Sequence, residues 1–393
     1  MKLLNIIKQL NKIELSEHQI LIFTNGVYLR KTINYGYSID YELVAGRTTS
    51  NIKVELTISN IESIEKDYNI RLLGVFNRNS NYEKILTINN GILFDSENFT
   101  KQLSENGFKI REFVINKIFG SKKIYDDLFD IIPLEIEFAG LDQKHFLSKD
   151  KLSHILNSQK TVINHKCLLY FDVQSVIDDA ISQVIACEKR IINIGVEQYH
   201  WLENNQGVYG KGKEFTEFGL TNYKLNALYS DCIIGLRSCL DLISKLYYVL
   251  YELKNYTGDY SSNVKLHYSS KYYSNAKEIS KIFGLSNTIF ELTNKYEGLG
   301  LIRNALIHNS FISPIPQIFR GNGTPQVNNK DIDYMICFMW DLEKNKPVIY
   351  KNRKRFFSQQ NQVDKFILNQ YLTLMEDIDN TMNLLINKIV NWN

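Results

Sequence analysis

Apolar residues recur at intervals of three and four over three long stretches in the second half of the chain. The clearest stretch covers residues 214–254, and its apolar members are Ile233, Leu236, Leu240, Ile243, Tyr247 and Leu250. The same spacing predicts helices over about 173–203 and 357–391, and shorter ones over 271–283, 286–297 and 299–309. A helix with one apolar stripe must bury that stripe against a neighbour. The stripes therefore predict an all-α bundle in this half.

The first half shows the shorter period that is typical of β-strands. Ile20–Phe23 and Val27–Arg30 flank Thr24-Asn25-Gly26, which suits a tight turn because Asn and Gly tolerate positive φ. Further strands are predicted over 39–45, 52–58, 70–76, 84–94 (with a second turn at Asn89-Asn90-Gly91) and 133–138. Between about 97 and 130 the spacing is helical. This half is therefore predicted to be a mixed α/β domain.

Residues 141–165 are polar and rich in Lys and His, and they mark the predicted boundary between two domains. The first domain covers 1–145 and is assigned a sensor or regulatory role, and the second is the bundle over 165–393. Met335–Asp341 and Pro347–Tyr350 around Glu343–Lys346 predict a β-hairpin inserted into the bundle. The fold class is thus α+β, and 393 residues suit two domains of about 100–200 residues each.

Composition limits the partners and the cellular compartment that we expect for this chain. The 46 Lys and Arg against 43 Asp and Glu leave a net charge of +3, so contacts with nucleic acid must come from local patches. Five cysteines with no C-x-x-C pair argue against a disulfide framework or a cysteine zinc site, and favour a reducing cytoplasm. No apolar run approaches the ~20 residues of a membrane span, so no membrane partner is expected.

Two catalytic motifs fail on their chemistry. Residues 207–213 match the first seven positions of a P-loop, but Glu214 stands where a hydroxyl should hold magnesium. Asp126, Asp127, Glu135 and Glu137 resemble the carboxylates of a metal-dependent nuclease, yet Glu137 replaces the lysine that would assist the attacking water. The seven histidines show no metal-ligand spacing. We therefore expect neither a metal site nor a bound cofactor.

The segment Gly298–Ser310 carries the strongest chemical signal. On a helix, Asn304 and His308 share a face within about 40°, and the long side chain of Arg303 can reach the same region. Arginine supplies a permanent positive charge for a phosphate, and histidine can transfer a proton near neutral pH. These groups provide the minimum chemistry for RNA cleavage without metal. The alternative is a histidine and an arginine that make ordinary surface or interhelical hydrogen bonds.

Arg303-Asn304-x-x-x-His308, late in a helical bundle, resembles the R-x4-6-H motif of the HEPN superfamily, and the resemblance covers about 165–393. It implies a homodimer whose two motifs form one cleft. It also implies a metal-independent endoribonuclease that leaves 2′,3′-cyclic phosphate ends, of the kind that serves as toxin, CRISPR effector or abortive-infection protein. By position, Arg303 and His308 would be the catalytic pair and Asn304 a supporting residue.

Two further groups are candidates for supporting roles. Arg237 and Asp241, four residues apart amid apolar neighbours, resemble the polar pair on an inner helix of such bundles. They can also be a plain intrahelical ion pair. The residues Lys351, Arg353, Lys354 and Arg355 form the densest basic stretch, and Phe356 and Phe357 follow it. That stretch can grip an RNA backbone and stack a base, or simply be a solvated entry to a helix.

Three functional hypotheses follow. The first is a cytoplasmic HEPN-type endoribonuclease acting on RNA, as a toxin or antiviral effector. The second is a catalytically inactive protein of the same fold that binds RNA, a nucleotide or a partner. The third is the toxin half of a pair with a nucleotidyltransferase antitoxin, for which the chain is long.

Overall fold

A computed structural model describes most of the chain. The described residues are 13–33, 39–45, 48–52, 56–79, 83–89, 91–129, 132, 134, 146–157, 161–204, 214–216, 219–253, 256, 285–291, 295–308, 317–319, 326–327, 330–331, 334–344, 346–353 and 356–390. Within them the chain has an α+β fold, as predicted, in which helices accompany an antiparallel sheet.

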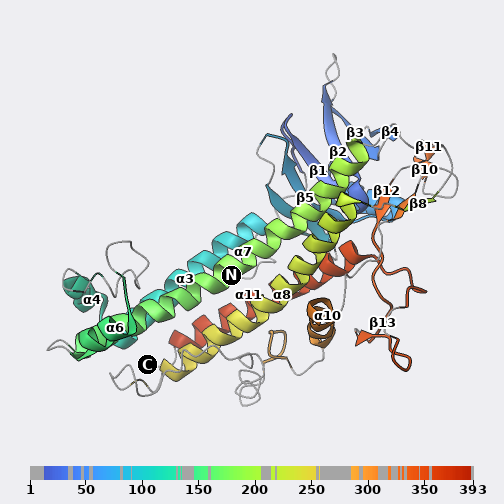
Figure 1. Cartoon of the computed structure of the whole chain (residues 1–393). Helices are drawn as coiled ribbons and strands as arrows, with labels where there is room; N and C mark the ends of the chain where they lie inside the picture. The colour runs from blue at the N-terminus through green and yellow to red at the C-terminus, as the bar shows by residue number, and fades with distance from the viewer. Residues whose placement is uncertain are drawn as a thin grey trace. The chain divides into compact units, whose positions relative to one another are not determined.

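Seven described strands between Gln19 and Asp95 form one sheet (Figure 1). Its strands are β1 (Gln19–Phe23), β2 (Tyr28–Ile33), β3 (Ile39–Ala45), β4 (Thr48–Ile52), β5 (Leu72–Asn77), β6 (Lys84–Asn89) and β7 (Ile92–Asp95). They lie in the order β4-β3-β2-β1-β5-β6-β7, and all neighbouring pairs are antiparallel.

Two tight turns organise this sheet as the sequence predicts. Between β1 and β2, Asn25 has a φ of 68° and Gly26 a φ of 79°. Gly91, between β6 and β7, has a φ of 74°. Asn and Gly adopt this left-handed conformation at little cost, which is why they occupy these positions. Both predicted turns and the strand over 39–45 are confirmed.

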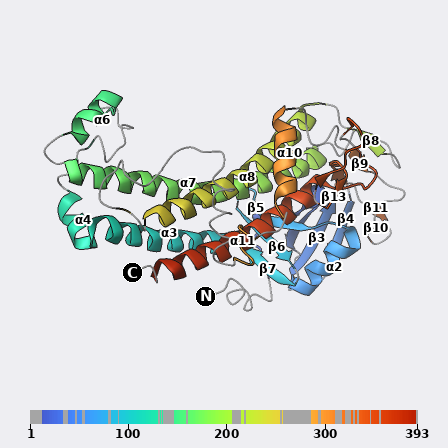
Figure 2. The same ribbon diagram turned by 90° about the horizontal axis from the view of Figure 1, so that it is seen from below.

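Both faces of the sheet are covered. On one face, Ile61 and Ile64 of α2 (Ile58–Tyr68) pack into a core with strand residues such as Leu21 and Leu29, and Figure 2 shows α2 beside the strands. On the other face lies the second half of α7 (Thr161–Asn204), where the ring of Tyr199 is 4.7 Å from that of Tyr28. Because both faces are buried, β1 is apolar from Ile20 to Phe23.

The predicted strand over 52–58 is wrong at its end, and residues 53–55 lie outside the described residues. β4 ends at Ile52, and α2 begins at Ile58. The side chain of Thr57 accepts a hydrogen bond from the backbone N–H of Asn60 at 3.3 Å, which is the geometry of a helix N-cap. The alternation therefore stops at a cap, after which Ile58, Ile61 and Ile64 recur every three residues.

The chain divides into two compact units, each built from three segments. Unit 1 comprises Met1–Phe99, Ile185–Arg237 and Thr293–Met375, and unit 2 comprises Thr100–Val184, Ser238–Leu292 and Glu376–Asn393. This division differs from the predicted domains 1–145 and 165–393. The reason is that α7, α8 (Leu220–Leu253) and α11 (Val363–Val390) each supply one part to each unit. The predicted polar boundary itself contains α6 (Lys149–Leu156) and the start of α7.

The regular elements in the described part of unit 2 are helices, and α3 (Ser96–Phe119) and α4 (Lys122–Phe129) confirm the helical prediction for about 97–130. Unit 2 contains most of α3 and all of α4. α3 lies against α7, where a Cβ on Gly107 would come within 2.6 Å of Ile181 Cδ1 and where Arg111 pairs with Asp178. The backbone N–H of Ile289 donates to Thr381 Oγ1 of α11 at 3.2 Å.

The second half of the chain is not all-α. β8 (Glu214–Thr216), β9 (Gln317–Phe319) and β12 (Tyr334–Ile336) form a three-stranded sheet, and β10 (Gln326–Val327) pairs with β11 (Lys330–Asp331). The predicted hairpin is shorter than expected. Only β13 (Leu342–Glu343) and β14 (Lys346–Pro347) form it, because the strand at Met335 pairs with β9 instead.

The predicted short helices have different outcomes. Residues 285–291 form turns where a helix over 286–297 was predicted, whereas α10 (Glu297–His308) matches the prediction over 299–309. The predicted helix over 271–283 and, apart from Leu134, the strand over 133–138 lie outside the described residues.

A buried polar cluster, the Asp364 cluster, lies within unit 1. It consists of Asn25, Gln198, Tyr229, Cys337 and Asp364, all at most 3% exposed. Asp364 accepts hydrogen bonds from Tyr229 Oη at 2.8 Å and from Gln198 Nε2 at 2.7 Å. Burial raises the pKa of the Asp364 carboxyl, and these hydrogen bonds oppose that rise. The cluster joins the β1–β2 turn to α7, α8 and α11.

The five cysteines are all buried, and none of them is in a disulfide. Burial raises the pKa of Cys167 to about 11 and that of Cys337 well above its ordinary value. Such thiols hold their protons at neutral pH and are poor nucleophiles.

None of the described helices is apolar over a stretch long enough to cross a membrane.

Candidate functional site

α10 carries the predicted catalytic residues, and its apolar side anchors it in unit 1. Leu299 and Ile302 are buried, and Tyr296, just before the helix, donates from its hydroxyl to the carbonyl of Thr373 in α11 at 3.4 Å. Glu297 at the start of the helix pairs with Lys346 of β14 at 2.8 Å. These contacts fix the start and the apolar side of α10 in unit 1. The opposite side of the helix faces solvent.

That solvent side presents Arg303 and Asn304. Asn304 is exposed and Arg303 half-buried, and Arg303 Nη1 donates to Asn304 Oδ1 at 3.0 Å. The apolar side chains of Leu301 and Ile307 are 42% and 47% exposed beside them. His308 is the last residue of α10, one turn after Asn304, and its side chain lies outside the described part of the structure. The structure thus brings Arg303 and Asn304 together and places His308 on the same helix.

Of the predicted supporting pair, Arg237 lies next to α10. A Cβ on Gly300 would sit 3.9 Å from Arg237 Nε, and Gly300 precedes Arg303 by three residues, or about one helical turn. Arg237 is half-buried on α8, and Asp241 follows four residues later on the same helix. Two guanidinium-bearing residues, one from α8 and one from α10, therefore belong to the same region of unit 1.

The basic stretch begins in a tight turn after β14. The backbones of Tyr350 and Arg353 exchange two hydrogen bonds of 3.0 Å, and Lys351 has a φ of 51°. Lys351 and Arg353 are exposed, and each lies over an aromatic ring: Lys351 Nζ is 5.6 Å from the ring centre of Tyr350, and Arg353 Cζ is 5.5 Å from that of Phe356. Lys354 and Arg355 lie outside the described residues.

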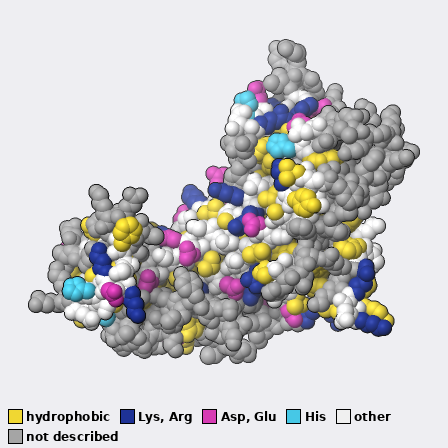
Figure 3. All heavy atoms as spheres, viewed as in Figure 1, with side chains coloured by type: hydrophobic (Ala, Val, Ile, Leu, Met, Phe, Trp, Pro, Cys, Tyr) yellow, Lys and Arg dark blue, Asp and Glu magenta, His cyan; other side chains and the backbone are white. Residues whose placement is uncertain are grey.

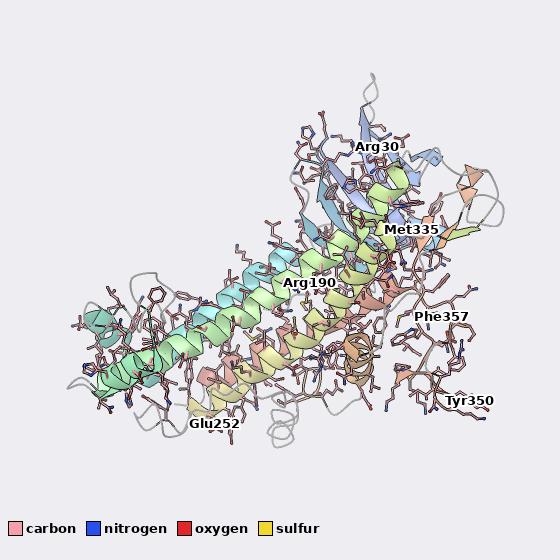
Figure 4. All side chains as sticks on the ribbon, viewed as in Figure 1. Arg30, Arg190, Glu252, Met335, Tyr350 and Phe357 are labelled. Atoms are coloured by element: carbon pink, nitrogen blue, oxygen red, sulfur yellow. The ribbon has the colours of Figure 1, made fainter. Side chains whose placement is uncertain are left out.

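Cations and aromatic groups are therefore neighbours on this segment. Figure 4 labels Tyr350 and Phe357 there, and Figure 3 shows Lys and Arg side chains beside hydrophobic ones at the lower right. Tyr350 is 65% exposed, and Ile349 before it is 60% exposed. An exposed ring next to a fixed cation is a surface on which a base can stack while its phosphate is neutralised.

Sequence patterns missed a cavity of about 380 Å³ next to the start of α11. Its lining includes Asn69 from the end of α2 and Lys365 from the first turn of α11. The run Gln359-Gln360-Asn361-Gln362 was the only available signal in the sequence, because four consecutive carboxamides are unusual before an apolar helix. The two sides of the cavity are almost 300 residues apart, so no local pattern could join them.

The two motifs that failed in the sequence lie mostly outside the described residues. Asp126 and Asp127 are exposed on α4, and residues 207–213 with Glu135 and Glu137 lie outside the described part. Across the described residues, no three or more His, Cys, Asp or Glu side chains are grouped so that they can hold a metal ion.

No family model matches the sequence, and neither a curated protein nor a solved structure matches it.

Proposed function

We propose that the protein is a metal-independent endoribonuclease whose reaction centre is built around Arg303, Asn304 and His308 of α10. The observation that carries the proposal is the solvent-facing Arg303–Asn304 pair, with His308 one turn further along the same helix. The resemblance of this spacing to the HEPN motif supplies the reaction class.

The chemistry of the proposed reaction needs two groups. The imidazole of His308 takes the proton of a ribose 2′-OH, or gives one to the departing 5′ oxygen. The guanidinium of Arg303 offsets the charge that grows on the phosphorane, and its bond to Asn304 restricts its orientation. Arg237, next to α10, adds positive charge to the same region. In the proposed homodimer, two such sets face one cleft.

The proposed substrate is RNA, and Lys351 and Arg353 are proposed to hold its backbone. Their exposure and their proximity to aromatic rings support this role. We further propose a cytoplasmic setting in host defence, as an abortive-infection effector or toxin under the control of an antitoxin or another regulatory partner.

The test is cleavage of tRNA and total RNA by purified protein in EDTA. We expect wild type to cut, and His308→Ala and Arg303→Ala to cut at least about a hundredfold more slowly, since a positioned acid–base group contributes about 10²–10⁴-fold. His154→Ala, which changes an exposed histidine on α6, is the matched control and should keep full activity. Wild type that is no faster than His308→Ala would overturn the proposal.

A second candidate is an RNA-binding protein of the same fold without chemistry, and the exposed Tyr350–Arg353 turn favours it. In that case RNA binding would weaken with salt and with Lys351→Ala or Arg353→Ala, while Arg303→Ala would change nothing. Filter binding at two salt concentrations distinguishes the two candidates when it is combined with the cleavage assay.

A further inference from the structure

The cavity beside α11 is formed by three separate parts of unit 1. Asn69 is the C-cap of α2, Met339 and Leu342 lie before and in β13, and the other lining residues lie just before α11 or in its first turns. Its volume of about 380 Å³ falls in the range of about 300–1,000 Å³ that is typical of small-molecule sites. The first turns of α11 therefore supply one wall, and the C-cap of α2 supplies a single residue.

Carboxamides dominate the polar part of the lining. Five of the nine described lining residues are of this type: Asn69, Gln360, Asn361, Gln362 and Asn369. None of the nine is acidic. A carboxamide offers a donor and an acceptor side by side, which matches the paired donors and acceptors on the edge of a nucleobase.

One of these carboxamides has an unmet acceptor. Gln362 Oε1 is buried and accepts no hydrogen bond from any described residue. Gln362 is one of the residues that line the cavity, and the terminal torsion of glutamine is soft. An N–H group on a ligand would satisfy this acceptor.

Lys365 provides the cation of the cavity. Its Nζ donates to the backbone oxygen of Asn69 at 2.8 Å and to Asn69 Oδ1 at 2.7 Å. An ammonium group has three donors, and no described residue accepts the third. Burial and the positive charge of Arg71 lower the pKa of Lys365, whereas Asp364 and Glu65 act in the opposite direction. A bound anion would offset the repulsion between the two cations.

The apolar part of the lining is formed by Met339, Leu342 and Phe366. Met339 is fully buried, and Leu342 and Phe366 are half-buried. The half-buried ring of Phe366 gives a planar heterocycle a surface to contact, since every base has a π-face that stacks on such a ring.

We propose that this cavity binds a nucleotide, with the base between Phe366 and the carboxamides and the phosphate at Lys365. The combination selects against other ligand classes. A divalent cation prefers carboxylates, which the lining lacks, and a neutral sugar makes no use of the lysine. The cavity lies at α11 and not at the α10 motif, so the inference does not depend on the ribonuclease activity.

Isothermal titration of the full chain tests the proposal. The probes are AMP, GMP, CMP and UMP, with inorganic phosphate and glucose 6-phosphate as ligands without a base. We expect at least one nucleoside monophosphate to bind in the micromolar range, and at least about tenfold more tightly than either baseless ligand, since base stacking contributes about 1–3 kcal/mol. A pentanucleotide that displaces the mononucleotide would identify RNA as the source of the ligand, and failure to displace it would identify free nucleotides.

Matched variants locate the binding. Lys365→Met should weaken binding about tenfold or more, as expected for a lost charged hydrogen bond, whereas Lys66→Met, on the exposed end of α2, should not. Phe366→Leu should weaken binding about fivefold or more, and Phe366→Tyr, which keeps the ring, should bind like wild type. Asn369→Ala, at an exposed position, gives a variant that is expected to fold even if Lys365→Met does not.

The proposal is overturned if none of the four nucleotides binds, or if glucose 6-phosphate binds as tightly as the best of them. It is also overturned if Phe366→Leu and Asn369→Ala both bind like wild type. None of these readouts involves RNA cleavage, so failure here and failure of the ribonuclease proposal remain distinguishable.

Discussion

At the scale of single residues, the buried Asp364 carboxylate accepts hydrogen bonds from two other buried side chains. It is 3% exposed and accepts from both Tyr229 and Gln198, which are themselves fully buried. Asp364→Ala leaves both donors without an acceptor and should lower the free energy of unfolding by about 3 kcal/mol, measured by urea denaturation. Asp364→Asn is the control, because its amide can still accept from Tyr229. If the two variants are equally stable, the hydrogen bonds do not carry this stability.

The same residue predicts a pH dependence. Burial raises the pKa of Asp364 in the folded state above its unfolded value of about 3.9. The folded state therefore binds this proton more tightly than the unfolded state does. The resulting stabilisation is complete below the unfolded pKa and is lost as the pH rises through the folded pKa. We expect the stability of wild type relative to Asp364→Asn to fall as the pH rises above about 4, and a constant difference would contradict the raised pKa.

At the scale of elements, the contact between β5 and α7 depends on Gly74. A Cβ there would lie 2.2 Å from the Lys84 carbonyl oxygen and 2.6 Å from Ile192 Cδ1, so the β5–β6 pair could not keep its spacing and the Ile192 side chain would have to move. Gly74→Ala should therefore destabilise the protein by about 2 kcal/mol or more in thermal or urea unfolding.

Gly300→Ala is the matched comparison for that prediction. Its new methyl group would have no neighbour closer than 3.9 Å, and alanine favours a helix. The free energy of unfolding should rise by about 0.5–1 kcal/mol. If both substitutions destabilise equally, glycine is needed for some reason other than close packing.

Elements with a strong local period were predictable. The expected face of the last helix is confirmed, since each of its described members is buried: Ile367, Tyr371, Leu374, Ile378, Met382 and Leu385. The start of that helix was placed at 357 and not at Val363, because the carboxamides before it neither favour nor forbid a helix. α2 was missed because its first residue, Ile58, continues the alternation of Ile52, Val54 and Leu56.

At the scale of the whole molecule, the ribonuclease proposal requires two copies of the chain. Light scattering of the purified protein should give about twice the chain mass of 45.9 kDa. A stable monomer across the working concentration range would remove the shared cleft. It would leave the nucleotide cavity unaffected, because that cavity is formed within one chain.

The sequence alone determined the features that depend on residues close together in the chain. These are the β1–β2 turn, the β-strands of the first half and the buried faces of the long helices. These follow from φ preferences and from periods of two and 3.6 residues, which act over a few positions. The tertiary structure decided how the chain divides into units and which side chains meet. Asn69 and Lys365 bond across 296 positions, and such pairs form only because packing of the apolar faces brings distant elements together.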